Sequence, residues 1–194
     1  KYVRVQGTGI QLTLANQTVS GNLAMEQIFS QESGYVVRVA LSALTMDFEQ
    51  DGQTYISVTE GQGFLVFNSF GIAGSFSASA SFNIPGVSIT IESIQVDVNT
   101  SAVAVYESMT LKGDVIDLAL PAGPFVRVVA IHAVLDINGT ALTGDFGFDQ
   151  TGDTVKVMRI AGSDGSLVRD GNGITDAEGA FGIITGGPGL ENRI

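Results

Sequence analysis

The sequence repeats itself at a constant offset of 123 residues, and this internal repeat restricts the chain to a fold built from duplicated units. Residues 2–27 align with residues 125–150, and nearly every position agrees in type. The match resumes after a two-residue gap, where residues 36–40 align with residues 157–161. A chance similarity would not keep its register over so long a stretch, so we interpret the match as a duplication.

The duplication divides the chain into three parts. We predict a complete β repeat over residues 2–124 and the start of a second, diverging repeat over residues 125–161. Residues 162–194 form a Gly/Asp-rich segment and tail, in which glycines and acids replace β-branched residues. Within this last part, residues 174–184 still resemble residues 57–67 faintly.

Apolar and polar residues alternate within the repeat, which is typical of β-strands with one buried face. Between Ser75 and Ile84 every second residue is apolar, and the residues between them are serine or asparagine. The parity of the apolar residues changes between Ile91 and Ile94, which predicts a β-bulge near Glu92 and Ser93.

The connections between these runs are short and rich in Asn, Asp and Gly, which favours antiparallel neighbours. No segment has a sustained helical stripe with caps at both ends, so helix is minor at most. We therefore predict an all-β fold of antiparallel strands, roughly ten per repeat at ordinary strand lengths. Two arrangements stay open: a tandem-repeat sandwich and a flattened β-solenoid.

The composition excludes several classes of partner. With 20 acidic and 9 basic residues, the net charge of −11 repels phosphate backbones, so we expect no nucleic-acid binding. No apolar stretch approaches the roughly 20 residues of a membrane helix, so we expect no membrane insertion. The chain has no cysteine, which rules out disulfides and thiolate metal sites.

Four arginines lie between apolar residues at equivalent places in the repeats: Arg4, Arg38, Arg127 and Arg159. We predict that each meets an acid such as Glu26 or Asp149 on a neighbouring strand. A ladder of arginines that binds a ligand is the alternative.

No residue set predicts catalysis, and we expect no enzymatic activity. His132 is the only histidine; it aligns with Gly9 and no Gly-x-Ser-x-Gly motif accompanies it. Carboxylates that could act as a glycosidase pair lie mostly at outward positions of strands. The chain also lacks Trp and has only 4 Tyr on which sugars could stack.

The Gly/Asp-rich segment contains the one candidate metal site, for which the only cofactor expected is Ca²⁺. Its oxygen-bearing residues are Asp164, Asp170, Asn172, Asp176 and Glu178. Calcium prefers about six to eight oxygen ligands, which such spacing can supply. The fit to an EF-hand loop is poor, since Ile174 and Phe181 occupy ligand positions. A plain cluster of Asp/Gly turns is the alternative.

Several turn and strand motifs resemble the tandem long repeats of very large exported bacterial surface proteins of the adhesin-like kind. The motifs are Gln17-Thr18-Val19-Ser20-Gly21-Asn22-Leu23, Gly71-Ile72-Ala73-Gly74-Ser75-Phe76, Ile84-Pro85-Gly86-Val87 and Leu120-Pro121-Ala122-Gly123-Pro124. The resemblance covers residues 2 to about 150 and brings no catalytic residue with it. It implies an extracellular or cell-surface location.

The resemblance and the repeat together predict a structural repeat module: a spacer, a stalk or a fibre-forming unit of a large extracellular surface protein. Its partners would be neighbouring repeats of the same protein, packed head to tail. The alternative is a calcium-dependent adhesion module or a carbohydrate-binding module.

Overall fold

The chain is described by a computed structural model, in which strands account for nearly all of the described residues. These residues are 2–14, 17–31, 34–50, 53–84, 87–137, 139–152, 156–169 and 171–185. The strands are β1 (Tyr2–Leu14), β2 (Gln17–Ser30), β3 (Gly34–Gln50), β4 (Gln53–Asn68), β5 (Gly71–Ile84), β6 (Val87–Asn99), β7 (Val105–Leu111), β8 (Asp114–Leu120), β9 (Phe125–Ile137), β10 (Thr140–Thr151), β11 (Lys156–Arg169) and β12 (Asn172–Thr185). Over these ranges no helix is long and apolar enough to cross a membrane.

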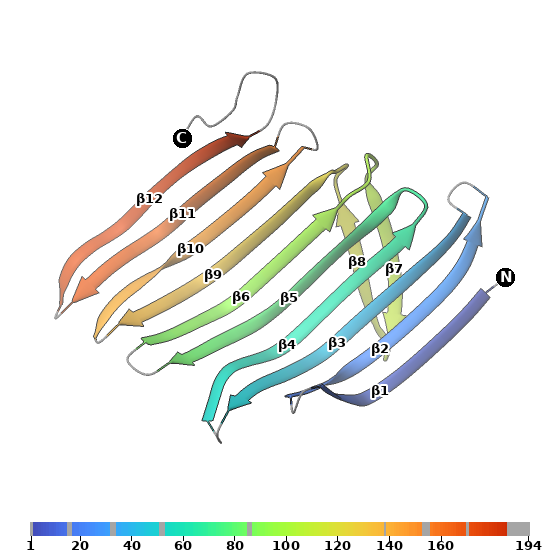
Figure 1. The fold of residues 1–194 in the computed structure, drawn as a ribbon, viewed down its shortest axis with the longest axis horizontal. Helices are drawn as coiled ribbons and strands as arrows, with labels where there is room; N and C mark the ends of the chain where they lie inside the picture. Colours follow the sequence, from blue (N-terminus) through green and yellow to red (C-terminus); the bar gives the residue numbers. More distant parts are fainter. Residues whose placement is uncertain are drawn as a thin grey trace.

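Ten of the strands form one antiparallel sheet, in which each strand pairs with the next along the chain (Figure 1). The exception is β6, which pairs with β9 because β7 and β8 leave the sheet and form a separate two-stranded hairpin. The expectation of an all-β, antiparallel fold is confirmed. Among the described residues, the second layer consists of the β7–β8 hairpin alone.

The strands are longer and fewer than the sequence predicts. Eight strands fall within residues 2–124, whereas we expected roughly ten. The apolar run at residues 36–40 and the run at residues 44–48 belong to the single strand β3, which continues through a register shift between Leu41 and Leu44. An irregularity inside one strand therefore reads in the sequence as a break between two.

The aligned segments pair in the same way. In the first, Arg4 lies opposite Glu26, and in the second Arg127 lies opposite Asp149. The division of the chain into residues 2–124, 125–161 and 162–194 stays a prediction. The sheet continues across the first of these boundaries through the pairing of β6 with β9, and the second boundary falls inside β11.

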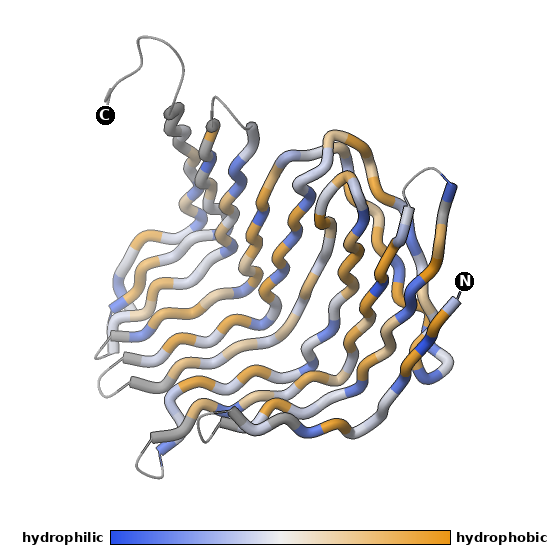
Figure 2. The backbone as a smooth tube through the Cα atoms, turned by 45° about the vertical axis from the view of Figure 1, so that its right-hand side comes forward, coloured by the Kyte–Doolittle hydropathy of each residue, from blue (hydrophilic) through white to orange (hydrophobic). Residues whose placement is uncertain are grey.

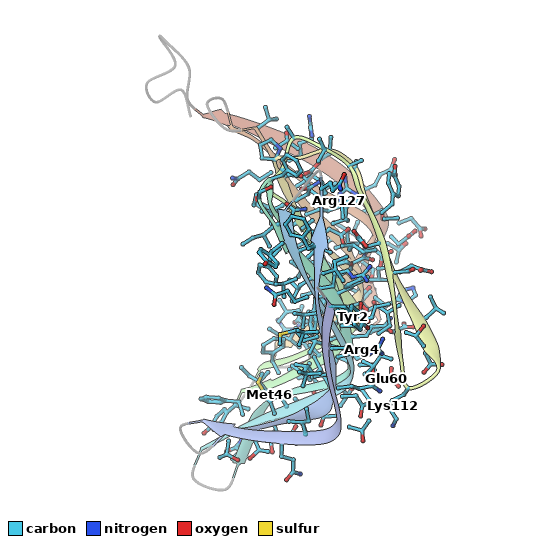
Figure 3. All side chains as sticks on the ribbon, turned by 90° about the vertical axis from the view of Figure 1, so that its right-hand side faces the viewer. Tyr2, Arg4, Met46, Glu60, Lys112 and Arg127 are labelled. Atoms are coloured by element: carbon cyan, nitrogen blue, oxygen red, sulfur yellow. The ribbon has the colours of Figure 1, made fainter. Side chains whose placement is uncertain are left out.

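A line of β-bulges crosses the sheet. Positive φ angles mark it at Gly9, Ala43, Glu60, His132, Asp164 and Asp176. The predicted bulge is confirmed, because Glu92 and Ser93 on β6 oppose the single residue Ser79 on β5. A bulge bends its strand. Seen edge-on, the strands turn sharply along this line, with Met46 inside the angle and the hairpin on the outer side (Figure 3).

The bulge is fixed by the same contact in both aligned segments. The Gly9 amide donates to Asn22 Oδ1 at 3.1 Å, and the His132 amide donates to Asp145 Oδ1 at 2.7 Å. Each side chain thus accepts from the amide of a residue with positive φ, 59° at Gly9 and 48° at His132. Such a contact removes the cost of leaving a backbone donor unpaired.

The core lies between the hairpin and the outer face of β2–β5. Phe64 and Leu111 are fully buried there, and Val66 and Leu118 are nearly so. Small residues, Ala24 and Ala40 among them, let the hairpin approach the sheet.

Asn99 fixes the point where the hairpin leaves the sheet. Its side chain is fully buried, and its Nδ2 donates to Val103 O at 2.9 Å and to Pro121 O at 2.8 Å. The backbone of Gly123 passes so close that a Cβ there would lie 2.0 Å from Asn99 O. No side chain fits at residue 123 without moving the hairpin.

Gly123→Ala therefore tests how the hairpin is attached. We expect a loss of about 1–3 kcal/mol in the free energy of unfolding, the usual cost of overpacking. Gly147→Ala is the matched control, since nothing lies within 4 Å of a Cβ at that position. Equal stability of both variants in urea denaturation would contradict the described junction.

Candidate functional site

The inner face of the bent sheet is apolar on both sides of the bend. Paired residues on neighbouring strands point to the same face, so the pairing register shows which residues share it. In the arm of the bent sheet that contains Met46, one row is Val19, Met46, Val58, Ala80, Ile91, Ala133 and Gly144. The next row is Phe48, Ile56, Phe82, Ile89, Leu135, Leu142, Leu167 and Ile174.

The same face continues in the other arm of the sheet, across the bend. One row there is Leu23, Leu41, Gly63, Phe76, Val96, Val128 and Phe148. A Cβ at Gly61 would lie 2.7 Å from Leu44 Cβ and 3.4 Å from Phe76 Cζ, so both side chains lie on one side of the sheet. We call this inner face the trough; it consists of these three rows together with Val5 and Ile10 of β1, Leu44 of β3 and Phe146 of β10.

The trough is open along the strands that the structure describes. Val5, Phe146 and Leu167, all on the inner face, are 52%, 41% and 47% exposed. Apolar stretches alternate with polar ones along the bent strands (Figure 2). Isolated exposed apolar residues are ordinary, but a continuous apolar face of this extent marks an interaction site.

A hollow of about 280 Å³ lies in the trough at β10–β12. Leu142, Phe146, Leu167 and Ile174 line its walls, and small residues, Gly162, Gly165, Ala177 and Gly179, lie between them. Four polar residues also border the hollow: Thr143, Ser163, Ser166 and Glu178.

The outer face is polar where the hairpin does not cover it. One row there is Thr13, Thr18, Asp47, Ser57, Ser81, Thr90, Val134, Thr143 and Ser166. Its side chains bond to each other across strands, as between Ser57 Oγ and Asp47 Oδ1 at 2.6 Å and between Thr143 and Ser166 at 2.6 Å. The bend therefore separates an apolar inside from a hydroxyl-rich outside.

An ionic cluster lies where the hairpin meets the outer face. Glu26 is 5% exposed and accepts from Arg4 and Arg38, each at 2.7 Å, and from the Tyr2 hydroxyl at 3.0 Å. Arg38 also pairs with Glu107 of the hairpin at 2.8 Å. The expected pairing of Arg4 and Arg38 with Glu26 is confirmed, and the cluster ties the hairpin to β1–β3.

The contacts of Glu26 favour its charged form. Burial opposes ionisation, but the Tyr2 hydrogen bond and the charges of Arg38 and Arg4 outweigh it and hold the pKa of Glu26 below its usual value of 4.5. For Arg38, burial is likewise outweighed, by Glu107 and Glu26, so its pKa is raised.

The second aligned segment carries a looser version of this cluster. Arg159 pairs with Asp149 at 3.3 Å, as expected. Arg127 instead lies with its guanidinium carbon 5.5 Å from the centre of the Phe125 ring, a cation–π contact. Asp149 Oδ1 is buried and has no hydrogen-bond partner.

Glu26→Gln should lower the free energy of unfolding at pH 7 by about 1–2 kcal/mol, because it removes a charge that two arginines share at a partly buried site. Since the folded pKa is lowered, this contribution is present above the unfolded pKa and is lost as pH falls through the folded pKa. The free energies of unfolding of the wild type and of Glu26→Gln, measured by denaturation between pH 7 and pH 3, should converge as the pH falls. Asp117→Asn, a substitution at an exposed position of β8, is the control. A difference between wild type and Glu26→Gln that stays constant at all pH values would contradict the described cluster.

His132 lies at the bulge of β9 and is exposed. Its Nδ1 lies 2.5 Å from Glu92 Oε2 on β6, and both side chains are about two-thirds exposed, 68% and 70%. The hydrogen bond and the charge of Glu92 raise the pKa of His132 above its usual 6.5. The pair is a surface contact across the β6–β9 junction.

Because the chain has one histidine, its titration can be followed without ambiguity by NMR. We expect the pKa of His132 to lie above 6.5 and to fall toward that value in Glu92→Gln. Glu178→Gln should leave it unchanged. An identical titration in wild type and Glu92→Gln would show that the two side chains do not meet.

The candidate calcium residues are spread along the β11–β12 hairpin. Asp164 and Asp176 occupy the bulges, with φ of 51° and 55°, and Asn172 begins β12 opposite Arg169. Glu178 lies further along β12, and Asp170 lies outside the described residues. Among the residues described, no three His, Cys, Asp or Glu side chains gather as a metal site. Calcium binding by this segment stays a prediction, which calorimetry with Ca²⁺ tests.

Comparison with protein families, curated proteins and solved structures finds no match to the chain. The geometry thus stands as the main guide to function. Sequence reasoning missed the trough as an open surface, although the alternation of apolar residues was its signal. It also missed Glu107, which is 69 positions from Arg38, and Tyr2, which lies two residues from Arg4 but reaches Glu26 through a hydroxyl that the arginine pattern does not signal.

Proposed function

We propose that this chain is a structural repeat unit, a spacer, stalk or fibre-forming module of a large extracellular surface protein. In this proposal, successive units join edge to edge through their β-sheets. The observation that supports it most is the pairing of β6 with β9, because this pairing continues the sheet from residues 2–124 into the residues that follow them.

The β6–β9 pairing indicates which strand could cover the free edge of β1. β1 aligns with β9, and each pairs with the following strand in the same register. On its other edge β9 meets β6, with Arg127 opposite Asp97. A preceding unit would bring its own β6 to the edge of β1, and its Asp97 equivalent would then lie opposite Arg4.

The other edge fits the same scheme. Residues 174–184 of β12 resemble residues 57–67 of β4, and β4 is followed in the sheet by β5. A following β5-like strand would therefore cover the free edge of β12. Uncovered edges of this length favour uncontrolled pairing, so an array that covers them removes a hazard.

The chemistry of the outer face suits an extracellular array. Hydroxyl side chains and a net charge of −11 keep a long assembly soluble. In place of the expected tandem-repeat sandwich or flattened solenoid, we propose one open sheet to which each further unit adds its strands.

A tandem variant tests the proposal. Residues 2–124 are placed directly before residues 2–194, which preserves the repeat offset. The amides of the original β1 that point away from β2 should exchange with deuterium at least tenfold more slowly than in the single chain, because a β6 strand now covers them.

The matched control is the same tandem chain with Gln95→Pro and Asp97→Pro in the added copy, which removes β6 donors from the new junction. The Thr100 amide donates to Ile72 O on β5, so the amides two and four residues before it also face β5, and those of Gln95 and Asp97 face the junction. We expect the β1 amides of this control to exchange as fast as in the single chain. Equal exchange in the single chain and in the unmodified tandem would overturn edge-to-edge joining.

A further inference from the structure

We propose that the trough binds the long unbranched aliphatic chains of acyl lipids, with the polar head group left in solvent. This inference does not rest on the proposed array, because the trough lies within a single chain. It follows from the chemistry of the trough walls, from the shape of the sheet and from the hollow at β10–β12.

The side chains of the three rows in the trough offer no hydrogen bonds. The three rows that define the trough contain only aliphatic residues, phenylalanine, methionine, alanine and glycine. The backbone beneath them is engaged in the ladder between neighbouring strands. A ligand with polar groups along its length would lose its hydration there without replacement, whereas a hydrocarbon chain loses nothing.

A second copy of the chain fits the trough poorly. Two concave faces touch only at their rims, and aligned sheets pack closely only when their faces are about 10 Å apart. The convex face of another copy would bring the hydroxyl row of Asp47, Ser57 and Ser81 into the trough. Burying these groups against carbon is unfavourable.

The hollow favours a hydrocarbon chain over a helix. Its volume is about 280 Å³ and it extends across β10, β11 and β12 between Phe146 and Ile174. A helix with its side chains is about 10–12 Å across and rises about 5.4 Å per turn, so a space of this volume holds less than one turn of it. A segment of a single hydrocarbon chain can lie on the glycines between the larger side chains.

The trough is also long and open at both ends. Its rows run across the strands from β2 to β12, and β1 contributes Val5 and Ile10 to the same face. Ten strands with a spacing of about 4.8 Å give a length of roughly 43 Å. An extended chain can therefore lie along the trough at right angles to the strands.

The experiment uses the full chain and a fluorescent 18-carbon polyene fatty acid whose emission increases when it leaves water. We expect saturable binding, below the concentration at which the probe forms micelles, and displacement by palmitate. Octanoate, shorter by eight methylenes, should displace the probe at least 100-fold less well, since each buried methylene contributes about 0.8 kcal/mol. Absence of binding, or equal displacement by both acids, would overturn the proposal.

Variants locate the probe. Phe146→Asp with Leu167→Asp places two charges in the hollow and should weaken binding at least tenfold. Val5→Asp places one charge at an exposed position of the trough on β1, outside the hollow, and should also weaken binding with less risk to folding. Val115→Asp is the matched control, because Val115 is 63% exposed and lies on the hairpin, outside the trough.

Circular dichroism confirms that each variant keeps its strand content, and light scattering measures its mass. Unchanged affinity in all folded trough variants would overturn the site. A wild-type dimer that ignores the probe and dissociates in Val5→Asp would show instead that a second copy covers the trough. Binding of an amphipathic helical peptide in preference to the fatty acid would equally overturn the proposal.

Discussion

The structure depends on bending a ten-stranded backbone ladder without breaking it. An unbent sheet of this width would present two broad faces to solvent, and its strands would need a second layer to bury the apolar one. The extra residues at the bulges let each strand turn and keep its apolar residues on the inner side of both arms. Asn22 and Asp145 stabilise the turn at two equivalent places by accepting from a bulge amide.

The bend explains how residues with different chemistry are distributed over the sheet. The hydroxyl row lies on the convex side, where solvent reaches it, and the apolar rows lie on the concave side. The hairpin covers an apolar part of the outer face, around Phe64 and Val66. At the border of this apolar region Glu26 and Arg38 connect the hairpin to the sheet, so the apolar core and the ion pairs hold the hairpin in the same position. The free edges and the trough are the surfaces to which we assign partners in the two proposals.

The sequence predicts much of the local structure. Two-residue periodicity indicates the strands, the parity change locates the bulge at Glu92 and Ser93, and the equivalent arginines predict the pairing of Arg4 and Arg38 with Glu26. These features depend on neighbours in one strand or on adjacent strands, which the repeat makes visible.

Other features could not be predicted, for physical reasons. Alternation shows that a strand has one apolar face but not what covers that face, so an open trough and a sandwich core have the same pattern. A bulged strand such as β3 reads as two strands, which explains the overestimated strand count. The contact of Arg4 with Thr110 O, at 2.6 Å, joins residues 106 positions apart, and no local pattern signals it.

Both aligned segments belong to one sheet because β6 pairs with β9. Nuclear Overhauser effects between these strands in the full chain test it most directly. We expect cross-strand contacts between backbone protons in a single register, with Val96 opposite Val128 and Ile94 opposite Ala130. Absence of these contacts, or contacts that place Val96 opposite another residue of β9, would contradict it.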